Sequence, residues 1–446
     1  MLTFDEISKI HFVGVCGASL SVLATLCLDM GLDVSGSDLR DCAQMDFLRE
    51  RGVDCVVGHD PSKVRDVDLV VYSSAINLDD QELVFARKIA VPCLERKDFL
   101  PLIASRFDKT ISISGSHGKT TTSLMIEHVM RKLGCKFASH IGGQAVDGTP
   151  SPVYTGNEYF LSEACEYRRS FLSFDSWLGV ITSIDYDHPD TYSDEGQYAD
   201  AFEEYRRRCT RCIVTQDCID KLSSRSNLVT CGYLPTCDYY ACNLQQDRAK
   251  FSYTLVHGSQ SVVVKLAVVG RHNVVNSMLA VATLHNLGFS LDSVCEALSD
   301  FEGVKRRMEC RGKTERGARV IVDYAHHPTE IKTAIDTALM MTRGKIWVVF
   351  QPHTYSRTAV LLDGFVDSFY WCDELIIAPT YSARESKSDG ADAFDLYCAL
   401  VRRGKMACYI DDDKKIADYI TKSAEKNDLI LILGAGDIAG LATLLV

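Results

Sequence analysis

The sequence lacks the features that mark secreted, repetitive and nucleic-acid-binding proteins. Its N-terminal stretch MLTFDEISKIHF has no basic segment followed by an apolar run, so we expect a cytoplasmic protein without a secretory signal. The net charge of -12 argues against nucleic acid and anionic membrane surfaces as partners. The 446 residues contain no internal repeat or low-complexity tract, which favours packed domains over flexible linkers.

A convincing membrane-spanning segment is also missing. The apolar run LILILGAGDIAGLATLLV near the C-terminus is interrupted by Asp437 and three glycines. This interruption is typical of a buried strand that turns into a helix. We therefore expect no membrane insertion.

Cysteine is plentiful, at 18 residues, but its spacing does not indicate a zinc site. Cys209 and Cys212 form the only close pair, and neither a second CxxC nor a His-x3-His follows them. Cys27, Cys135 and Cys398 lie in apolar runs. We expect such cysteines to be small buried side chains in a reducing cytoplasm.

The length predicts about three domains, because 446 residues exceed what one core organises. Apolar strands alternate with helical stripes in the N-terminal part, as in KIHFVGV, SVLATLCLDMG and DVSGSD. The same rhythm returns in KIWVVFQPH, DELIIAPTY and DLILILGAGD. Such alternation predicts parallel sheets of βαβ units. We predict an α/β fold with domains at residues 1–107, 108–308 and 309–446.

The stretch ISISGSHGKTTTS has the pattern of a phosphate-binding turn. Gly115 and Gly118 permit backbone angles that point N–H groups at an anion, and the turn leads into a predicted helix from Lys119. Lys119 can reach the outer phosphates, and Thr120 can place its hydroxyl on Mg²⁺. A full P-loop pattern would have glycine at Ile113, so this is a shorter form that still predicts nucleotide binding. The predicted helix has one apolar face, formed by Met125, Ile126, Val129, Met130 and Leu133.

The short form SGSHGKTT resembles the ATP site of the Mur ligases, which add amino acids to the peptidoglycan precursor. The resemblance implies a central P-loop-type ATPase domain between two Rossmann-like domains. The N-terminal one holds UDP and the C-terminal one holds the amino acid. GRHNVVN resembles the adenine loop of the family, although Asn273 could also simply cap a helix. The nucleotide-binding residues implied are Gly115, Ser116, His117, Gly118, Lys119, Thr120, Thr121, His272, Asn273, Asn276, Arg307 and Asp323.

Two acidic segments provide candidate Mg²⁺ ligands. Glu163 ends an apolar strand in LSEACEYRRSFL and matches the metal-binding glutamate of the family, with Glu166 as a substrate-facing residue. His188 in DYDHPD matches the second-metal histidine, and Thr120 completes the implied metal set. Several Mur ligases carry a carbamylated lysine after this segment. GQYADAFEEYRRRC offers none, which suits the alanine-adding branch.

The turn in HFVGVCGASLSVLA does not match a dinucleotide fingerprint. That fingerprint requires glycine at 14, 16 and 19, and only Gly14 is present, so an NAD-dependent oxidoreductase is disfavoured. The turn can still hold a diphosphate on its helix dipole, and it resembles the family's UDP loop with Cys16 in place of a glycine. The implied UDP-side residues are Gly14, Gly17, Ser37, Asp38, Ser73 and Ser74.

FQPHTYSRT follows an apolar strand and resembles the family's amino-acid site, with Thr354 in place of an arginine. Arg357 could clamp a carboxylate through two hydrogen bonds. The implied residues around the reaction centre are Tyr324, His326, His327, His353 and Arg357.

The resemblance implies an ATP-dependent ligase that joins L-alanine to the lactyl carboxylate of UDP-N-acetylmuramate through an acyl phosphate. Lys119, His188 and Arg307 are the implied catalytic residues, and ATP and Mg²⁺ are the implied cofactors. We expect a monomer or homodimer that contributes to peptidoglycan synthesis. Two alternatives stay open: a ligase that attaches a recycled peptide to the same sugar, and a non-catalytic nucleotide-binding regulator on this scaffold.

Overall fold

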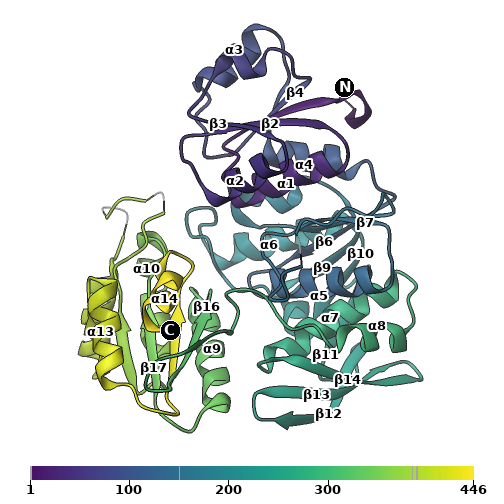
Figure 1. Ribbon diagram of the computed structural model, residues 1–446. Helices are drawn as coiled ribbons and strands as arrows, with labels where there is room; N and C mark the ends of the chain where they lie inside the picture. The colour runs from purple at the N-terminus through teal and green to yellow at the C-terminus, as the bar shows by residue number, and fades with distance from the viewer. Residues whose placement is uncertain (1–2, 150, 384, 388–389) are drawn as a thin grey trace.

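The computed structural model describes residues 3–149, 151–383, 385–387 and 390–446. It contains three α/β domains, each with its own sheet. In Figure 1 the N-terminal domain lies at the top, the middle domain below it, and the C-terminal domain beside the middle domain. Within the described ranges, no helix is both long and apolar enough to cross a membrane.

The N-terminal domain has one parallel sheet with strand order β3-β2-β1-β4-β5. Its core buries Ile10 and Phe12 of the central strand against Leu23 of the next helix. The order reverses between β1 and β4, so the turns after these strands border the crevice where such sheets bind ligands. The elements are Lys9–Val13 (β1), Ala18–Asp29 (α1), Asp33–Asp38 (β2), Ala43–Glu50 (α2), Asp54–Val57 (β3), Leu69–Tyr72 (β4), Gln81–Lys88 (α3), Cys93–Glu95 (β5) and Arg96–Ala104 (α4).

The middle domain has a nine-stranded sheet with order β14-β13-β12-β11-β10-β9-β6-β8-β7. The last strands along the chain, β12 to β14, pair antiparallel and extend the otherwise parallel sheet. Its strands are Lys109–Ser114 (β6), Phe137–His140 (β7), Tyr159–Glu163 (β8), Ser176–Ile181 (β9), Cys209–Thr215 (β10), Leu228–Gly232 (β11), Tyr239–Asp247 (β12), Lys250–His257 (β13) and Gln260–Val269 (β14). Its helices are Lys119–Lys132 (α5), Glu195–Arg207 (α6), His272–Asn286 (α7) and Leu291–Leu298 (α8).

The predicted apolar face of α5 is confirmed. Met125, Ile126, Val129 and Met130 are buried in the core of the middle domain, and Leu133 packs against it. The two strands beside β6 are β8 and β9, both parallel to it. Their carboxyl ends therefore lie at the same sheet edge as the phosphate turn, as predicted for the two acidic segments.

The C-terminal domain has the strand order β15-β16-β20-β17-β18-β19, with only the edge pair β15-β16 antiparallel. Its apolar C-terminal run forms the fully buried strand β20, then a turn and a short helix, which confirms the prediction for that segment. The elements are Glu309–Lys313 (β15), Arg319–Asp323 (β16), Pro328–Met341 (α9), Ile346–Phe350 (β17), Tyr355–Val360 (α10), Leu362–Ser368 (α11), Glu374–Ile377 (β18), Ala393–Arg402 (α12), Cys408–Tyr409 (β19), Asp413–Ser423 (α13), Leu429–Leu433 (β20) and Ala442–Leu445 (α14).

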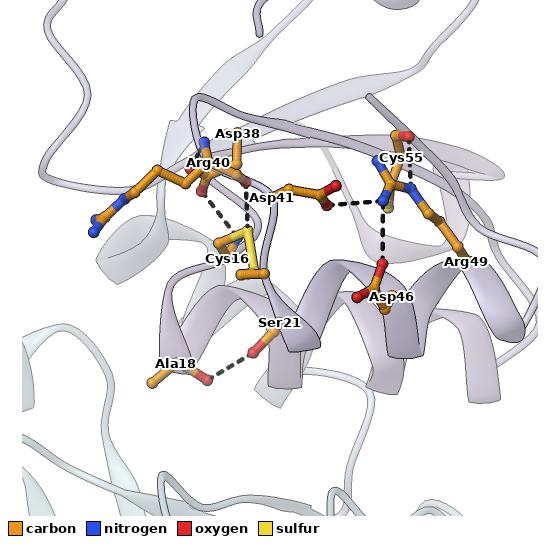
Figure 2. Close-up of a disulfide and its surroundings, with 10 residues drawn as sticks. Cys16, Ala18, Ser21, Asp38, Arg40, Asp41, Asp46, Arg49 and Cys55 are labelled. Carbon is orange, nitrogen blue, oxygen red and sulfur yellow. Dashed lines mark hydrogen bonds and ion pairs between the residues drawn. A yellow bond between two sulfur atoms is a disulfide. The ribbon is translucent and has the colours of Figure 1, made fainter. Parts of the chain in front are cut away.

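The cysteines agree with the sequence-based expectation only in part. Cys27 and Cys135 are buried free thiols, and Cys398 is a half-buried one. Cys16 and Cys42, however, form a disulfide, so the expectation of reduced cysteines is wrong there (Figure 2). The two residues are 26 positions apart in the chain, and only the fold brings the turn after β1 to the start of α2.

Candidate active site

The phosphate turn joins β6 to α5 and requires glycine at two positions. Gly118 has a φ of +85°, and an added Cβ would lie 2.6 Å from Oδ1 of Asn276. Gly115 has a φ of +132°, and an added Cβ would collide with Oγ1 of Thr182. Left-handed backbone and close approach both exclude a side chain. The turn is therefore pressed against the end of β9 and the start of α7.

Lys119 is held at the first position of α5 by a buried glutamate. Its Nζ lies 3.0 Å from Oε2 and 3.1 Å from Oε1 of Glu166, and it also donates to the backbone oxygens of Gly115 and Ser116. Burial lowers the pKa of Lys119, but Glu166 outweighs burial and raises it. Burial raises the pKa of Glu166, but Lys119 and His188 outweigh the effect of burial, and the pKa of Glu166 is lowered overall. Both groups are therefore charged.

Polar contacts continue from Glu166 into the C-terminal domain. Nε2 of His188 lies 3.5 Å from Oε1 of Glu166 and 3.8 Å from Oδ2 of Asp187. The Asp187 carboxylate accepts hydrogen bonds from Nε of Arg357 at 2.9 Å and from its Nη2 at 3.3 Å. Burial raises the pKa of Asp187, but Arg357 and His188 hold it well below its usual range. Sequence reasoning missed Asp187, although it precedes His188 directly.

The C-terminal side of this region contributes two neutral imidazoles. Nη1 of Arg357 lies 3.0 Å from Nδ1 of His353, and the ring of His326 lies 5.7 Å from that of His353. Burial lowers the pKa of His326 to about 3, and burial together with Arg357 lowers that of His353 to about 4. Tyr324 stacks edge-on against His326 at 5.2 Å. Tyr324, His326, His353 and Arg357 are thus brought close together, whereas the fifth predicted residue of the reaction centre, His327, lies against Asp185 and Tyr186.

A second charged cluster connects the phosphate turn with the start of the C-terminal domain. Nε2 of His117 lies 3.0 Å from Oδ2 of Asp185, and its Nδ1 lies 3.4 Å from Oε1 of Glu330. The same Glu330 oxygen lies 3.2 Å from Nη1 of Arg307, which is 4.0 Å from Oδ1 of Asp323. Burial lowers the pKa of His117, but its hydrogen bonds to Asp185 and Glu330 outweigh burial and raise it to about 9.

Sequence reasoning did not assign roles to Asp185 and Glu330. Glu330 lies in the stretch VIVDYAHHPTEI, in the first turn of α9 and four residues after His326. His327 caps α9 by accepting from the backbone N–H of Thr329, and its Nε2 lies 3.2 Å from the backbone oxygen of Tyr186. His327 therefore connects the C-terminal domain with the middle domain.

A cavity of about 570 Å³ opens between the middle and C-terminal domains, within the size range of small-molecule sites. Burial and the nearby Arg307 lower the pKa of His272 to about 4, so its imidazole is neutral. Asn273 does not cap α7, since the cap residue is Arg271; its Nδ2 donates to the backbone oxygen of Val269 at 2.7 Å. The predicted nucleotide residues that line the cavity are His117, Gly118, Thr121, His272, Asn273, Asn276, Arg307 and Asp323.

Glu163 offers a carboxylate that fits a divalent cation. It ends β8, its Oε2 accepts from the backbone N–H of Gly142 at 3.2 Å, and its buried Oε1 has no hydrogen-bond partner. Burial raises the pKa of Glu163, and the nearby positive charges of Lys119 and Arg307 oppose this only in part. An orphaned carboxylate oxygen beside a phosphate turn is the hard ligand that Mg²⁺ prefers.

Compact groups of metal-type side chains also occur in the described part of the chain. Neither of the two such groups contains Glu163, His188 or a cysteine: one is His117, Asp185 and His327, and the other is His59, Asp80 and Glu82. Glu163 and His188 thus belong to no common cluster of this kind.

The predicted UDP-side residues lie at or beside the carboxyl ends of β1, β2 and β4. Gly14 has a φ of +85°, and an added Cβ would lie 3.3 Å from Cβ of Ser73. Oδ2 of Asp38 accepts from the backbone N–H of Cys16 at 3.0 Å. The side chain of Ser37 is fully buried and donates to Glu82 at 2.6 Å, which directs it away from the crevice. Gly17 is the cap residue of α1, and Ser74 is half-buried in the turn after β4.

Three residues that sequence reasoning missed meet at the start of α1. Oγ of Ser19 lies 2.8 Å from Nε2 of His140, and Nη1 of Arg96 donates to the same Oγ at 3.4 Å. His140 comes from β7 of the middle domain, so this contact lies between domains. A guanidinium at a helix N-terminus favours an anion there.

Comparison with known proteins agrees with this architecture. The Mur ligase family catalytic domain matches residues 9–108, the Mur ligase middle domain residues 113–284, and the Mur ligase glutamate ligase domain residues 306–436. The UDP-N-acetylmuramate–L-alanine ligase of Clostridium acetobutylicum is 36% identical, over 97% of this chain and 96% of that protein. The enzyme of the same name from Acetivibrio thermocellus is 34% identical, over 97% and 94%.

Solved structures of Mur-type ligases share the three-domain architecture of this chain. The UDP-N-acetylmuramate–alanine ligase of Thermotoga maritima superposes with a TM-score of 0.82 at 30% identity, covering 98% of this chain and 97% of that one. A murein peptide ligase from Psychrobacter arcticus shares the fold, with a TM-score of 0.72 at 23% identity and 98% coverage of each chain. The chain therefore belongs to the Mur ligase family.

Proposed function

We propose that this protein is an ATP-dependent ligase that joins L-alanine to the lactyl carboxylate of UDP-N-acetylmuramate. The observation that carries the proposal is the continuous series of polar contacts from Lys119 on the phosphate turn, through Glu166, His188 and Asp187, to Arg357 in the C-terminal domain. It joins a phosphate-binding group to a carboxylate-binding group across the domain boundary. The alanine ligases at 34 to 36% identity over nearly the whole chain support the same substrates.

ATP binds in the cavity between the middle and C-terminal domains. The phosphates lie on the turn at residues 115–121, where Lys119 exchanges Glu166 for a phosphate oxygen. Arg307 offsets the negative charge that develops on the transferring group, and Asp323 holds the ribose. The neutral His272 and Asn276 lie beside the base.

Thr120 and Glu163 would hold one Mg²⁺ ion, and His188 a second. The ions supply charge neutralisation of the phosphate oxygens when bound. The orphaned Oε1 of Glu163 is the structural support for this assignment. Lys119 contributes a fixed positive charge next to these ligands.

The reaction proceeds in two steps. The lactyl carboxylate attacks the γ-phosphorus of ATP, ADP leaves, and an acyl phosphate forms. The amine of alanine then attacks the acyl carbon, and inorganic phosphate leaves with the amide bond formed. Arg357 binds the carboxylate of alanine while it remains paired with Asp187, so substrate binding and the contact between domains are coupled.

Three further assignments belong to this proposal. Residues 1–107 hold the UDP moiety, residues 108–308 hold ATP, and residues 309–446 hold alanine. The protein acts in the cytoplasm, where ATP is supplied, and contributes to peptidoglycan precursor synthesis. It works as a monomer or a homodimer.

The test is release of phosphate from ATP and Mg²⁺ with UDP-N-acetylmuramate and L-alanine, serine, glycine or a tripeptide in turn. Release that requires both the sugar nucleotide and L-alanine, and is lost in Lys119→Ala, supports the proposal. Lys132→Ala on the exposed end of the same helix is the matched control and retains activity. A preference for the tripeptide would favour the recycling ligase. Tight ATP binding without turnover would favour the regulator and reject the ligase.

A further inference from the structure

Cys16 and Cys42 lie in two neighbouring loops at the carboxyl edge of the N-terminal sheet, one after β1 and the other after β2. Cys16 lies in the diphosphate turn, defined here as residues 14–17 between β1 and α1, and Cys42 caps α2. Their Cα atoms are 6.4 Å apart, and the two sulfurs form a disulfide (Figure 2). The other 16 cysteines are free thiols, so this pair alone is oxidised.

Hydrogen bonds already connect the two segments. The backbone N–H groups of Gly14 and Val15 both donate to the backbone oxygen of Ser37, at 2.8 and 3.0 Å. Oδ2 of Asp38 accepts from the N–H of Cys16, and its Oδ1 accepts from the N–H of Arg40 at 3.1 Å. The disulfide closes this network covalently, so that the diphosphate turn and residues 37–42 move together.

The disulfide lies on the side of β1 away from β4. Gly14 packs against Ser73 after β4, where the strand order reverses, whereas Cys42 follows β2 on the opposite side of β1. Both cysteines are half-buried, so small thiol reagents can reach them. A brace of this kind reduces the ordering that the turn undergoes when it binds a diphosphate.

We propose that Cys16 and Cys42 are a reversible thiol modification site whose oxidation strengthens binding of the UDP-sugar substrate. The oxidant is a low-molecular-weight disulfide such as glutathione disulfide. This inference rests on the proposed function, because the diphosphate of UDP-N-acetylmuramate is the ligand assigned to the turn.

The exchange balances in two steps. A thiolate of the pair attacks one sulfur of the small disulfide, whose S–S bond breaks, and a mixed disulfide forms as one small thiolate leaves. The second cysteine thiolate then attacks the protein sulfur of the mixed disulfide and expels the other small thiolate. The protein loses two electrons and two protons, and the oxidant becomes two thiols. A dithiol reductant reverses both steps.

The experiment uses the full-length protein in two states, reduced with dithiothreitol or oxidised with glutathione disulfide. Alkylation under denaturing conditions, read by peptide mass spectrometry, should find 18 thiols in the reduced state and 16 in the oxidised state. The KM for UDP-N-acetylmuramate should be about 3- to 10-fold lower in the oxidised state, since ordering one or two side chains is worth that much. The KM for ATP and kcat should not change.

Cys42→Ser should give the reduced-state KM under both conditions, and Cys93→Ser, at a half-buried free thiol of the same domain, should keep the response. The wild-type comparison stands even where a variant fails to fold. Equal KM values in the two confirmed redox states overturn the proposal, as does failure of glutathione disulfide to form the bond. If neither the reduced nor the oxidised protein releases phosphate with these substrates, the proposed function fails. Calorimetry of UDP-N-acetylmuramate binding to each redox state then tests this inference separately. Equal affinity, or no binding, rejects it.

Discussion

Asp187→Asn tests whether the ion pair with Arg357 holds the C-terminal domain against the middle domain. Asp187 and Arg357 are 5% and 6% exposed, and the carboxylate accepts two hydrogen bonds from the guanidinium. Asparagine keeps the shape and one acceptor oxygen. Its amide N–H₂ faces a guanidinium N–H, however, and the carboxylate charge that pairs directly with Arg357 is lost. Removal of one partner from a buried pair costs about 3–5 kcal/mol.

We take about 3 kcal/mol, the lower end of that range, because one hydrogen bond is retained. This free energy acts on the contact between domains, so it shifts their closed arrangement toward an open one by about 100-fold. Closure brings Arg307 and Asp323 onto ATP, so kcat/KM for L-alanine should fall by about 100-fold. Binding of UDP-N-acetylmuramate by the N-terminal domain should not change.

Steady-state phosphate release measures kcat/KM, calorimetry measures sugar-nucleotide affinity, and small-angle scattering measures the radius of gyration. Asp200→Asn, at an exposed position of the same domain, is the matched control and should behave as wild type. The reasoning is refuted if Asp187→Asn keeps kcat/KM within about 3-fold of wild type with an unchanged radius of gyration, an effect no larger than that of a surface pair.

Three other predictions concern the phosphate turn. Gly118→Ala should lower the free energy of unfolding by about 1–3 kcal/mol and raise the KM for ATP. The reason is that Gly118 has a φ of +85° and that an added Cβ would collide with Asn276. Thermal melts and an ATP titration that match those of wild type would contradict this prediction. Glu163→Gln should raise the Mg²⁺ concentration for half-maximal activity by about tenfold or more at an unchanged KM for alanine, and an unaltered Mg²⁺ titration would exclude a ligand role. The raised pKa of His117 contributes stability that is present below about pH 6.5, its unfolded value, and is lost as pH rises through about 9. The difference in unfolding free energy between wild type and His117→Gln, from urea denaturation, should therefore shrink over that interval, and a constant difference would show that His117 does not titrate as described.

Features encoded by neighbours in the chain could be predicted from the sequence. The phosphate turn is one, because Gly115, Gly118 and Lys119 lie within five consecutive residues and a helical stripe follows them. The strand ends at Glu163 and before His188 are another, since a buried apolar run that stops at an acid marks the edge of a sheet. Each of these signals is local, and the fold places each where expected.

Pairings between distant residues could not be predicted in this way. Asp187 pairs with Arg357 across 170 positions, and Cys16 pairs with Cys42 across 26, but neither member of a pair shows in the sequence which residue its partner is. Glu166 was expected to face substrate, and the fold places it directly on Lys119.

By itself the sequence determined the α/β class, the phosphate turn and the family, because backbone conformation and apolar periodicity depend on residues near one another. Only the tertiary structure decided which charge balances Lys119, which carboxylate holds Arg357, and which cysteines are joined. These pairings depend on how the elements of the three domains pack, because that packing decides which side chains lie close enough to a buried charge or thiol to interact with it.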